Sequence, residues 1–557
     1  MNEQRTQTYL NLINQLLSCN DGDEPRSLQE NQELLDQSLV TELLKVADNL
    51  RLRSDLNNAN RLMNIAGNLL QSYSSSSIKT ETNYLNFLIE TLQKISENPN
   101  PQVIYPFWAQ NLDKLDDNLA RILDSWARNT LTQATPEQAY FIAVYIGNFS
   151  NLICQFPLGD ITTHKEIAIT GYEIALTIFT FEAFPQEWAL TQFSLAIAYR
   201  NRIRGEKADN LERAITAYQE ALKVYTFDAF PQAWARTQTN LGTAYSDRIR
   251  GDKAENLEQA ISCYTKALKV STFEAFPQDW ATTQYNLALA YYSRIRGEKA
   301  DNLEIAITAY EKALKVLTFD AFPQEWAMTQ NNLGEAYRNR IRGDKADNLE
   351  KAIDAYKEAL NVRTFDAFPQ EWADTQNNLA AAYSNRIRGD KAENIKQAVM
   401  CYQNALQGYE TAGDFLNAAE MGLTLGKIKV DRGEWYQGLA YLEKSLKIYR
   451  QFDDLKSRAD TIYQIAHTHH LIGNHEKASI YYRDALRFYE YLKHDRGVAF
   501  CQASLGRLML QIGFVEKAEE LLKKATFIFK ELNNEQEIAK IAEVLNCLAK
   551  IKEKQAV

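Results

Sequence analysis

The sequence is poor in residues that interrupt regular structure, with only 22 Gly and 11 Pro among 557 residues. Few turns are available, so long helices with short connections are expected. No apolar run approaches the roughly 18 residues that cross a membrane. The first stretch, MNEQRTQTYLNLINQLLSCN, lacks the basic start and apolar core of a signal peptide. These absences predict a cytoplasmic protein with no membrane partner.

Cysteine and histidine are also scarce, with six of each. The cysteines have no paired spacing that suits zinc or a redox dithiol, so buried thiols are expected. In the only histidine cluster, His467 and His470 share a helix face, but no acidic or thiol ligand has a suitable spacing. No Gly-rich phosphate loop, catalytic carboxylate pair or nucleophile motif is present. We therefore expect no metal, no cofactor and no enzymatic activity.

The sequence contains instead a repeat of fixed period. Near-copies of the stretch TFDAFPQEWA, here called the joint, begin at Thr180, Thr226, Thr272, Thr318 and Thr364, an interval of 46 residues. Each joint leads into W-A-x-T-Q-x-x-L-x-x-A-Y-x-x-R-I-R-G and then a second amphipathic segment such as NLEQAISCYTKALKV. The joint Pro is expected in the first turn of a helix, where a missing N–H costs nothing. The joint Phe and Trp are expected to dock one repeat on the next, each worth about 1.5–3 kcal/mol if fully buried.

Within each repeat, the pattern L-[GA]-x-x-Y followed by A-x-x-x-Y-x-x-A resembles the tetratricopeptide repeat, a helical hairpin of about 34 residues. In the second copy the matching positions are Leu241, Gly242, Tyr245, Ala260, Tyr264 and Ala267. The RIRG loop and the extended first helix account for the greater length. After about residue 404 the period shortens to 40, as Gly433, Gly473 and Gly513 mark. The resemblance implies an all-α, right-handed α-solenoid of helical hairpins.

The expected organisation has five parts. They are an N-terminal helical region at 1–70, a Ser-rich linker at 71–80, a helical region at 81–135, long repeats at 136–404 and ordinary repeats at 405–557. The N-terminal region and the RIRG repeats resemble the front part of bacterial, chiefly cyanobacterial, proteins in which such repeats precede a caspase-like CHAT peptidase domain. That domain and its His/Cys dyad have no counterpart in these residues, so the resemblance implies no catalytic role here.

Comparing the five copies separates a fixed face of the first helix from a variable one. If residues are counted from the joint Trp as zero and placed at 100° intervals, the invariant positions, including Arg at 14 and Ile at 15, fall on one arc. The variable positions fall on the opposite arc, which lines the concave surface in tetratricopeptide arrays. The aromatic, amide and Arg side chains there suit a binding groove; unselected drift is the alternative. The candidate groove residues on this arc are Phe193, Tyr285, Tyr292, Asn331, Asn377, Arg200, Arg236 and Arg338.

Position 6 borders this arc and is almost uniform, with Ser194 followed by Asn240, Asn286, Asn332 and Asn378. An amide both donates and accepts, so such a row can bind the backbone of an extended peptide. The row resembles the asparagine ladder of kinesin light chains and O-GlcNAc transferase. The alternative is that these amides bond to neighbouring helices.

The RIRG loops place ten arginines, from Arg202 to Arg388, along one edge. Regularly spaced guanidiniums suit a nucleic-acid backbone. The favoured interpretation is instead pairing with the repeated joint acids Glu182, Asp228, Glu274, Asp320 and Asp366. The net charge of −10 also makes nucleic acid an unlikely partner.

The sequence therefore predicts a scaffold or sensor that binds an extended segment of a protein or peptide partner in its groove. By resemblance, the array regulates a separate caspase-like protease or signalling effector. A nucleic-acid-binding regulator that uses the RIRG edge is the alternative.

Overall fold

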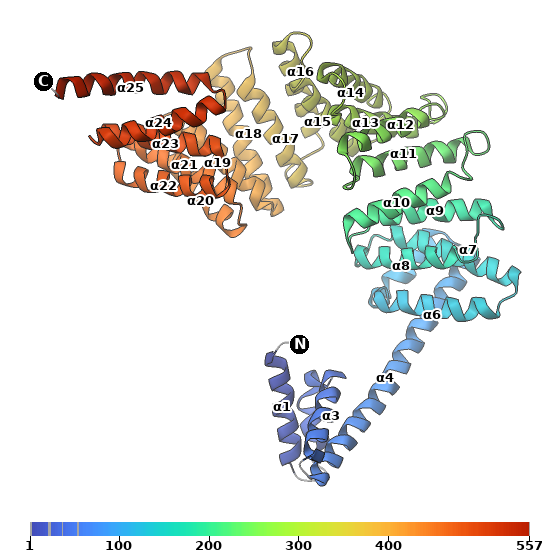
Figure 1. Cartoon of the computed structure of the whole chain (residues 1–557). Coiled ribbons are helices and arrows are strands. Elements are labelled where there is room, and N and C mark those ends of the chain that lie inside the picture. Colours follow the sequence, from blue (N-terminus) through green and yellow to red (C-terminus); the bar gives the residue numbers. More distant parts are fainter. Residues whose placement is uncertain (1–2, 20–23, 36, 53–54, 556–557) are drawn as a thin grey trace. The chain divides into compact units, whose positions relative to one another are not determined.

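A computed structural model describes residues 3–19, 24–35, 37–52 and 55–555, and every regular element in these ranges is a helix (Figure 1). The chain divides into two compact units, residues 1–250 and 251–557. None of the described helices has the length and apolar character needed to cross a lipid bilayer.

Unit 1 joins a small N-terminal helical group to the first hairpins. Tyr9, Leu43 and Leu62 share the core of that group. Between Pro136 and Asp247, each helix packs on the next one along the chain. The elements of unit 1 are α1 (Glu3–Ser18), α2 (Glu24–Gln29), the 3-10 helix η1 (Gln32–Leu34), α3 (Gln37–Leu52), α4 (Leu56–Glu97), α5 (Pro101–Ala109), the 3-10 helix η2 (Leu112–Lys114), α6 (Asp117–Gln133), α7 (Pro136–Gln155), α8 (Ile161–Ala175), α9 (Pro185–Arg200), α10 (Lys207–Ala221) and α11 (Pro231–Asp247).

Unit 2 is a stack of hairpins, and from Lys299 onward each second helix packs on both its own first helix and the next helix along the chain. The expected all-α solenoid is therefore confirmed. The helices of unit 2 are α12 (Lys253–Ala267), α13 (Pro277–Ser293), α14 (Lys299–Ala313), α15 (Pro323–Arg338), α16 (Lys345–Leu360), α17 (Pro369–Asn385), α18 (Lys391–Ala412), α19 (Phe415–Asp431), α20 (Trp435–Gln451), α21 (Leu455–Ile472), α22 (His475–Tyr491), α23 (Asp495–Gln511), α24 (Val515–Glu531) and α25 (Glu535–Gln555).

Two expected boundaries fall inside helices. The sequence predicts a Ser-rich linker at 71–80, but α4 continues through these residues. Serine costs less than about 0.7 kcal/mol per residue relative to Ala in a helix, and neither Gly nor Pro interrupts this stretch. The expected boundary at 404/405 likewise falls within α18. Residues 71–80 are therefore helical. The change from the 46-residue to the 40-residue period occurs within α18.

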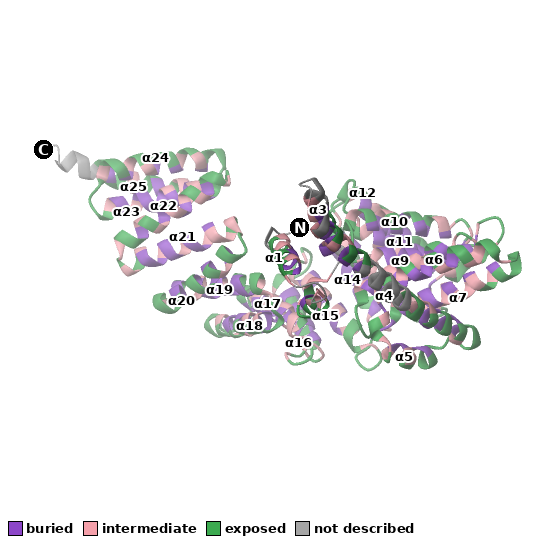
Figure 2. Cartoon of the chain, turned by 90° about the horizontal axis from the view of Figure 1, so that it is seen from below, coloured by how far each residue is buried: buried purple, intermediate pink, exposed green. Residues whose placement is uncertain are grey.

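Tyrosines of the second helices form the centre of the stack. Tyr310 and Tyr356 expose 1% and 0% of their surface, and the Ala that follows each joint Trp exposes none. Figure 2 shows the resulting alternation of buried and exposed positions along each helix. Gly334 on α15 leaves room for the Tyr356 ring of the second helix, because a Cβ at Gly334 would lie 2.8 Å from that ring.

The joint has the predicted proline geometry but not the predicted aromatic burial. In all five long repeats the joint Pro lies in the first turn of the first helix, as expected. The Thr272 hydroxyl and carbonyl accept N–H groups of Ala275 and Phe276, which shapes the turn. Of the five joint Trp residues, only Trp188 is buried. Trp280 is half-buried and lies edge-on to the exposed ring of Phe273 at 5.3 Å. The joint aromatics therefore cover the turn more than they fill the core.

The first arginine of each RIRG loop clasps the preceding hairpin. Arg294 donates from Nε and Nη2 to the two carboxylate oxygens of Glu258, at 2.8 and 2.9 Å. Asn302 accepts from Arg294 and donates to the Arg296 carbonyl. Gly297, at φ +77°, allows the turn between them. The corresponding bidentate pairs, together called the RIRG clasps, are Arg202–Glu166, Arg248–Glu212, Arg340–Glu304 and Arg386–Glu350.

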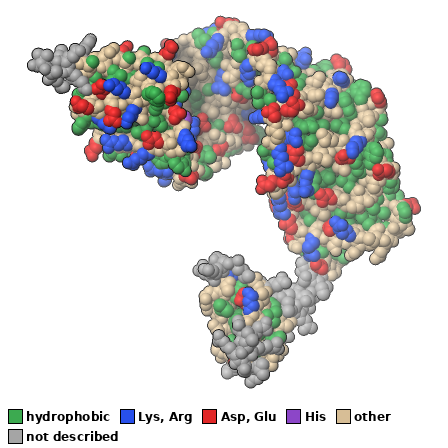
Figure 3. Space-filling model, in the orientation of Figure 1, with side chains coloured by type: hydrophobic (Ala, Val, Ile, Leu, Met, Phe, Trp, Pro, Cys, Tyr) green, Lys and Arg blue, Asp and Glu red, His purple; other side chains and the backbone are tan. Residues whose placement is uncertain are grey.

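The partners of these arginines differ from the prediction. The joint acids Glu182, Asp228, Glu274, Asp320 and Asp366 are exposed. The second arginines also reach second-helix acids, as in the Arg342–Asp301 and Arg388–Asp347 pairs. The acids of the preceding second helix lie close to the RIRG loop. The joint acids lie at the opposite end of the first helix, too far from the arginines to pair with them. Figure 3 shows basic and acidic side chains interspersed on the visible face.

The invariant Ile of the loop was expected on the packed arc, and this expectation is wrong. Ile203, Ile295 and Ile341 expose 66%, 61% and 62% of their surface. The first helix ends before this residue, so the 100° spacing no longer describes its direction.

The clasps predict loss of stability in acid. Hydrogen bonds from the clasp arginines lower the pKa of Glu212, Glu258, Glu304 and Glu350. A folded-state pKa below the unfolded value of about 4.3 stabilises the fold above that value. This contribution is lost as pH falls through the folded-state pKa. We expect the thermal midpoint to fall below about pH 4.3, and to fall less in Glu258→Gln, as scanning calorimetry across pH 3–6 would measure. Equal slopes for both proteins would contradict the clasp at Glu258.

Candidate functional site

The first helices of unit 2 bring most of the predicted groove residues to one face, called here the first-helix face of α13, α15 and α17. These side chains are half-buried or more, and Tyr285 and Asn331 expose only 9% and 8% of their surface. Both residues occupy position 5, counted from the joint Trp, so this variable position is not freely exposed. The residues of the predicted set on this face are Tyr285, Asn286, Tyr292, Asn331, Asn332, Arg338, Asn377 and Asn378.

Four of these side chains form a continuous hydrogen-bonded chain, called here the amide row. Asn378 Nδ2 donates to Asn331 Oδ1 at 3.3 Å. Asn331 Nδ2 donates to Asn332 Oδ1 at 3.2 Å, and Asn332 Nδ2 donates to the Tyr285 hydroxyl at 2.8 Å. The row thus joins the first helices of three successive repeats, and positions 5 and 6 act together.

A second polar cluster lies nearer the C-terminal ends of α13 and α15. The Tyr292 hydroxyl donates to Glu335 Oε1 at 2.8 Å and accepts from Asn339 Nδ2 at 2.7 Å. Arg338 Nη2 lies 3.9 Å from the same carboxylate. Burial, followed by the Glu335 charge, raises the pKa of Tyr292 to about 12, so this hydroxyl stays protonated and can donate.

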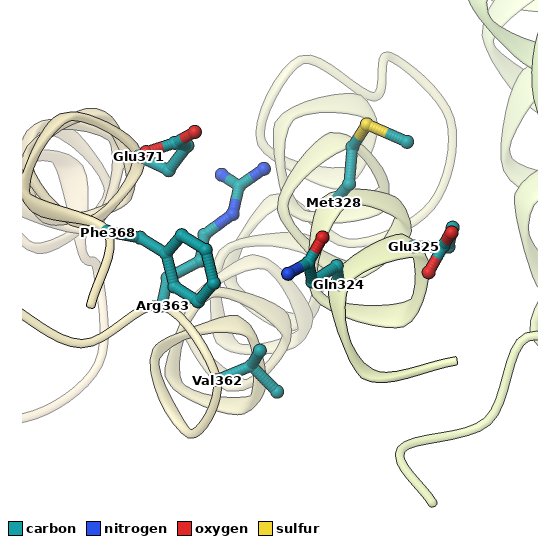
Figure 4. A pocket seen from close by; sticks show the side chains of 7 residues that line it. All are labelled: Gln324, Glu325, Met328, Val362, Arg363, Phe368 and Glu371. Atoms are coloured by element: carbon teal, nitrogen blue, oxygen red, sulfur yellow. The ribbon is translucent and has the colours of Figure 1, made fainter. Parts of the chain in front are cut away.

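The comparison of first helices missed Arg363, which precedes the joint Thr of the fifth long repeat. Its side chain enters a cavity of about 260 Å³ between the N-terminal ends of α15 and α17 (Figure 4). The lining residues are Gln324, Glu325, Met328, Val362, Arg363, Phe368 and Glu371. Burial raises the pKa of Tyr285 to about 12, and the nearby Arg363 charge opposes that rise. The cavity lies between α15 and α17, the two helices that carry the asparagines of the amide row.

One signal in the sequence would have found Arg363. The residue before the joint Thr is Phe179, Tyr225, Ser271 and Leu317 in the other copies, and each of these is buried. A charged residue at a buried position of a repeat is informative, because burying a charge is costly unless it is compensated.

The candidate residues of unit 1 are described separately. Phe193 lies edge-on to Tyr218, with ring centroids 5.9 Å apart, and the Arg236 guanidinium lies 5.9 Å from the Phe193 ring. Arg200 Nε lies 3.1 Å from Asp247 Oδ2. Asn240 is half-buried on α11. The Arg236–Phe193 and Arg200–Asp247 contacts join neighbouring hairpins of unit 1, whereas Phe193 and Tyr218 belong to the same hairpin.

The histidine cluster is used within the fold of unit 2. His470 Nε2 lies 2.6 Å from Gln511 Oε1, and His469 stacks on Tyr481. Among the described residues, no group of three or more His, Cys, Asp or Glu side chains is placed to hold a metal ion.

The stacked hairpins, the joints and the clasps define a helical-repeat solenoid protein. Two models of the tetratricopeptide repeat match the sequence, one at 415–491 and the other at 234–273 and 326–366. The chain thus contains tetratricopeptide repeats in both its 46-residue and its 40-residue parts.

Solved structures of repeat proteins are similar to this chain only at low identity. The apo form of RapI is 12% identical over 66% of this chain and 98% of that chain, with a TM-score of 0.45. A Rap protein complexed with competence and sporulation factor is 12% identical over 66% and 99%, with a TM-score of 0.36. A signal-transduction ATPase with a tetratricopeptide repeat sensor, from Pyrococcus horikoshii, is 15% identical over 78% and 74%, with a TM-score of 0.36. These likenesses carry no functional argument, and a search of curated protein sequences found no match.

Proposed function

We propose that the first-helix face of unit 2 binds an extended segment of a partner protein, so that the array acts as an interaction scaffold or sensor. The amide row is the observation that carries this proposal. A side-chain amide has two N–H donors and an oxygen with two lone pairs. The bonds of Asn332 and Asn378 within the row hold the amides at fixed positions, and their second N–H groups can bind peptide carbonyls.

Tetratricopeptide repeats and a fixed polar row together favour binding over catalysis. The ring of Tyr285, which exposes 9% of its surface, and the half-buried ring of Tyr292 lie on the same face and suit side-chain selection, since aromatic residues give large contact area at low entropic cost. The resemblance to the front part of CHAT proteins makes a separately encoded caspase-like protease, or another signalling effector, the protein that such an array would regulate. The RIRG arginines are held in ion pairs, which weakens the nucleic-acid alternative.

The amide row predicts the effect of removing its members on binding. A partner is first identified by pull-down with the full chain and mass spectrometry. Asn332→Ala and Asn378→Ala should each weaken its binding by about 1–2 kcal/mol, largely independent of ligand sequence, because a backbone hydrogen bond is lost. Calorimetry of the single and double variants measures this loss, with folding checked by circular dichroism.

Two matched variants separate binding from framework. Asn385→Ala removes an amide whose one hydrogen bond among the described residues is to the Ala381 carbonyl of its own helix, so affinity should stay unchanged. Tyr285→Phe removes the hydroxyl that accepts from Asn332 but keeps the amide. If the Asn332/Asn378 double variant folds and binds like the parent, the first-helix face is not the binding site. An equal loss in Tyr285→Phe would assign the row to the framework.

A further inference from the structure

Arg363 breaks the pattern of the joints. Three of the four matching residues, Phe179, Tyr225 and Leu317, are hydrophobic and expose only 3%, 9% and 5% of their surface, and the fourth, Ser271, is buried as well. In the fifth repeat a guanidinium stands at this position, half-buried and turned into the cavity between α15 and α17. Figure 4 shows it rising between Phe368 and Met328. A hydrophobic contact has been replaced here by a charge that faces an open space.

Among the described residues, Arg363 has little compensation for its desolvation. Its Nη1 donates to Thr375 Oγ1 at 3.0 Å, and no described carboxylate lies within ion-pair distance. Burial lowers the pKa of Arg363, although a guanidinium remains charged in proteins. Since a guanidinium carries five N–H donors, the bond to Thr375 leaves most of the hydrogen-bonding capacity of Arg363 unused by the described residues.

Asp374, one of the two acids whose charge acts on Arg363, is already engaged elsewhere. Asp374 accepts a hydrogen bond from the Tyr409 hydroxyl at 2.7 Å. Burial raises the pKa of Asp374, while the Arg363 charge opposes that rise. Glu325 and Glu371, the two acids that line the cavity, are exposed to solvent. An anionic group of a ligand can therefore reach Arg363 through the open cavity. It must pass the exposed carboxylates of Glu325 and Glu371.

We propose that Arg363 pairs with one carboxylate of the bound segment, either its C-terminal carboxylate or an Asp or Glu side chain. This inference rests on the proposed function and specifies its ligand. A planar guanidinium binds a carboxylate through two parallel hydrogen bonds. The cavity, at about 260 Å³, is smaller than the roughly 300–1,000 Å³ of whole-ligand sites and suits a single side chain or chain end. Glu325 and Glu371 favour neutral or basic residues on either side of that carboxylate, and they disfavour a polyanion.

The chain itself offers the matched variant. Arg363→Leu installs the residue that occupies the equivalent position at Leu317, so the fold should be retained, as circular dichroism and the unfolding midpoint will show. Arg363→Lys keeps the charge but loses the planar fork. Arg388→Ala removes an exposed arginine of the same unit, paired with Asp347, and serves as the charge control.

The probes are fluorescein-labelled random decapeptide sublibraries, measured by anisotropy with the full chain. One pair fixes Glu or Gln at a central position of amidated peptides, and the other has a free or an amidated C-terminus. We expect one carboxylate-bearing sublibrary of the two pairs to bind more tightly than its neutral counterpart. Arg363→Leu should weaken its binding about 10- to 100-fold and abolish that preference. The affinity of Arg363→Lys for this sublibrary should lie between those of the parent and Arg363→Leu. Arg388→Ala should bind it as tightly as the parent does.

The two pairs identify the source of the carboxylate. A preference for Glu over Gln that depends on Arg363 supports a side chain, and a preference for the free C-terminus supports a chain end. Peptide binding without an Arg363-dependent carboxylate preference overturns this inference and leaves the proposed function standing. No binding of any sublibrary to the parent overturns both.

Discussion

Replacing Tyr310 with Ala is expected to destabilise unit 2 by about 3–5 kcal/mol, the cost of deleting a fully buried ring. Tyr310 exposes 1% of its surface, and its ring centroid lies 5.8 Å from that of Tyr285. Trp280→Ala should cost less, about 1–2 kcal/mol, because Trp280 is only half-buried. Urea unfolding, together with hydrogen exchange of the α13–α16 amides, measures both effects.

Tyr310→Phe is the control for this pair, because it keeps the ring and removes only the hydroxyl. It should stay within about 1.5 kcal/mol of the parent. Since repeat arrays unfold in nearest-neighbour steps, the Tyr310→Ala variant should lose exchange protection first in α13–α16. A Trp280 variant that proves less stable than the Tyr310 variant would contradict the burial described here.

The second large effect is expected at the first RIRG arginine. Arg294→Ala should destabilise the array by about 1–3 kcal/mol, because it leaves the Glu258 carboxylate, about a quarter exposed, without its bidentate partner. Arg296→Ala should cost no more than about 1 kcal/mol, since its ion pairs are half-exposed. Arg294→Lys should recover part of the loss, and a double-mutant cycle with Glu258→Gln gives the coupling energy.

The same variants test the RIRG edge as a nucleic-acid site. Neither substitution should change binding of a single-stranded oligonucleotide, measured by anisotropy across salt concentrations. If the parent binds it with a steep salt dependence and Arg296→Ala abolishes that binding at unchanged stability, the edge is a nucleic-acid surface.

Much of the fold could be predicted because the same local sequence patterns recur in every repeat. The period, the paired helices and the Pro at each helix start follow from local patterns that recur five times. Failures arose where a local rule was extended beyond its element. The helical wheel placed the loop Ile on the packed face, although the helix ends before it. The arginines were assigned to the acids of the joint, whereas the partner of the first arginine lies 36 residues earlier, on the preceding hairpin.

The candidate site was predicted in part for a related reason. Variation among copies pointed to the first-helix face, but it does not show that Asn331 and Asn332 of one helix bond to partners on both neighbouring helices. Arg363 lies in the connector before α17. A comparison of first helices alone does not include that position.

The clasps have a further consequence for how such an array changes length. Removing residues 272–317, one complete period, would place Glu258 at the spacing from Arg340 that Glu304 now occupies, and Glu255 at the spacing from Arg342 that Asp301 occupies. Each clasp would therefore re-form with chemically equivalent partners. The amide row has no such interchangeability, because removing this period removes Tyr285, and the preceding copy has Thr239 at the matching position. We therefore expect the gain or loss of a whole repeat to cost little folding free energy. Each such event would change which side chains lie on the first-helix face.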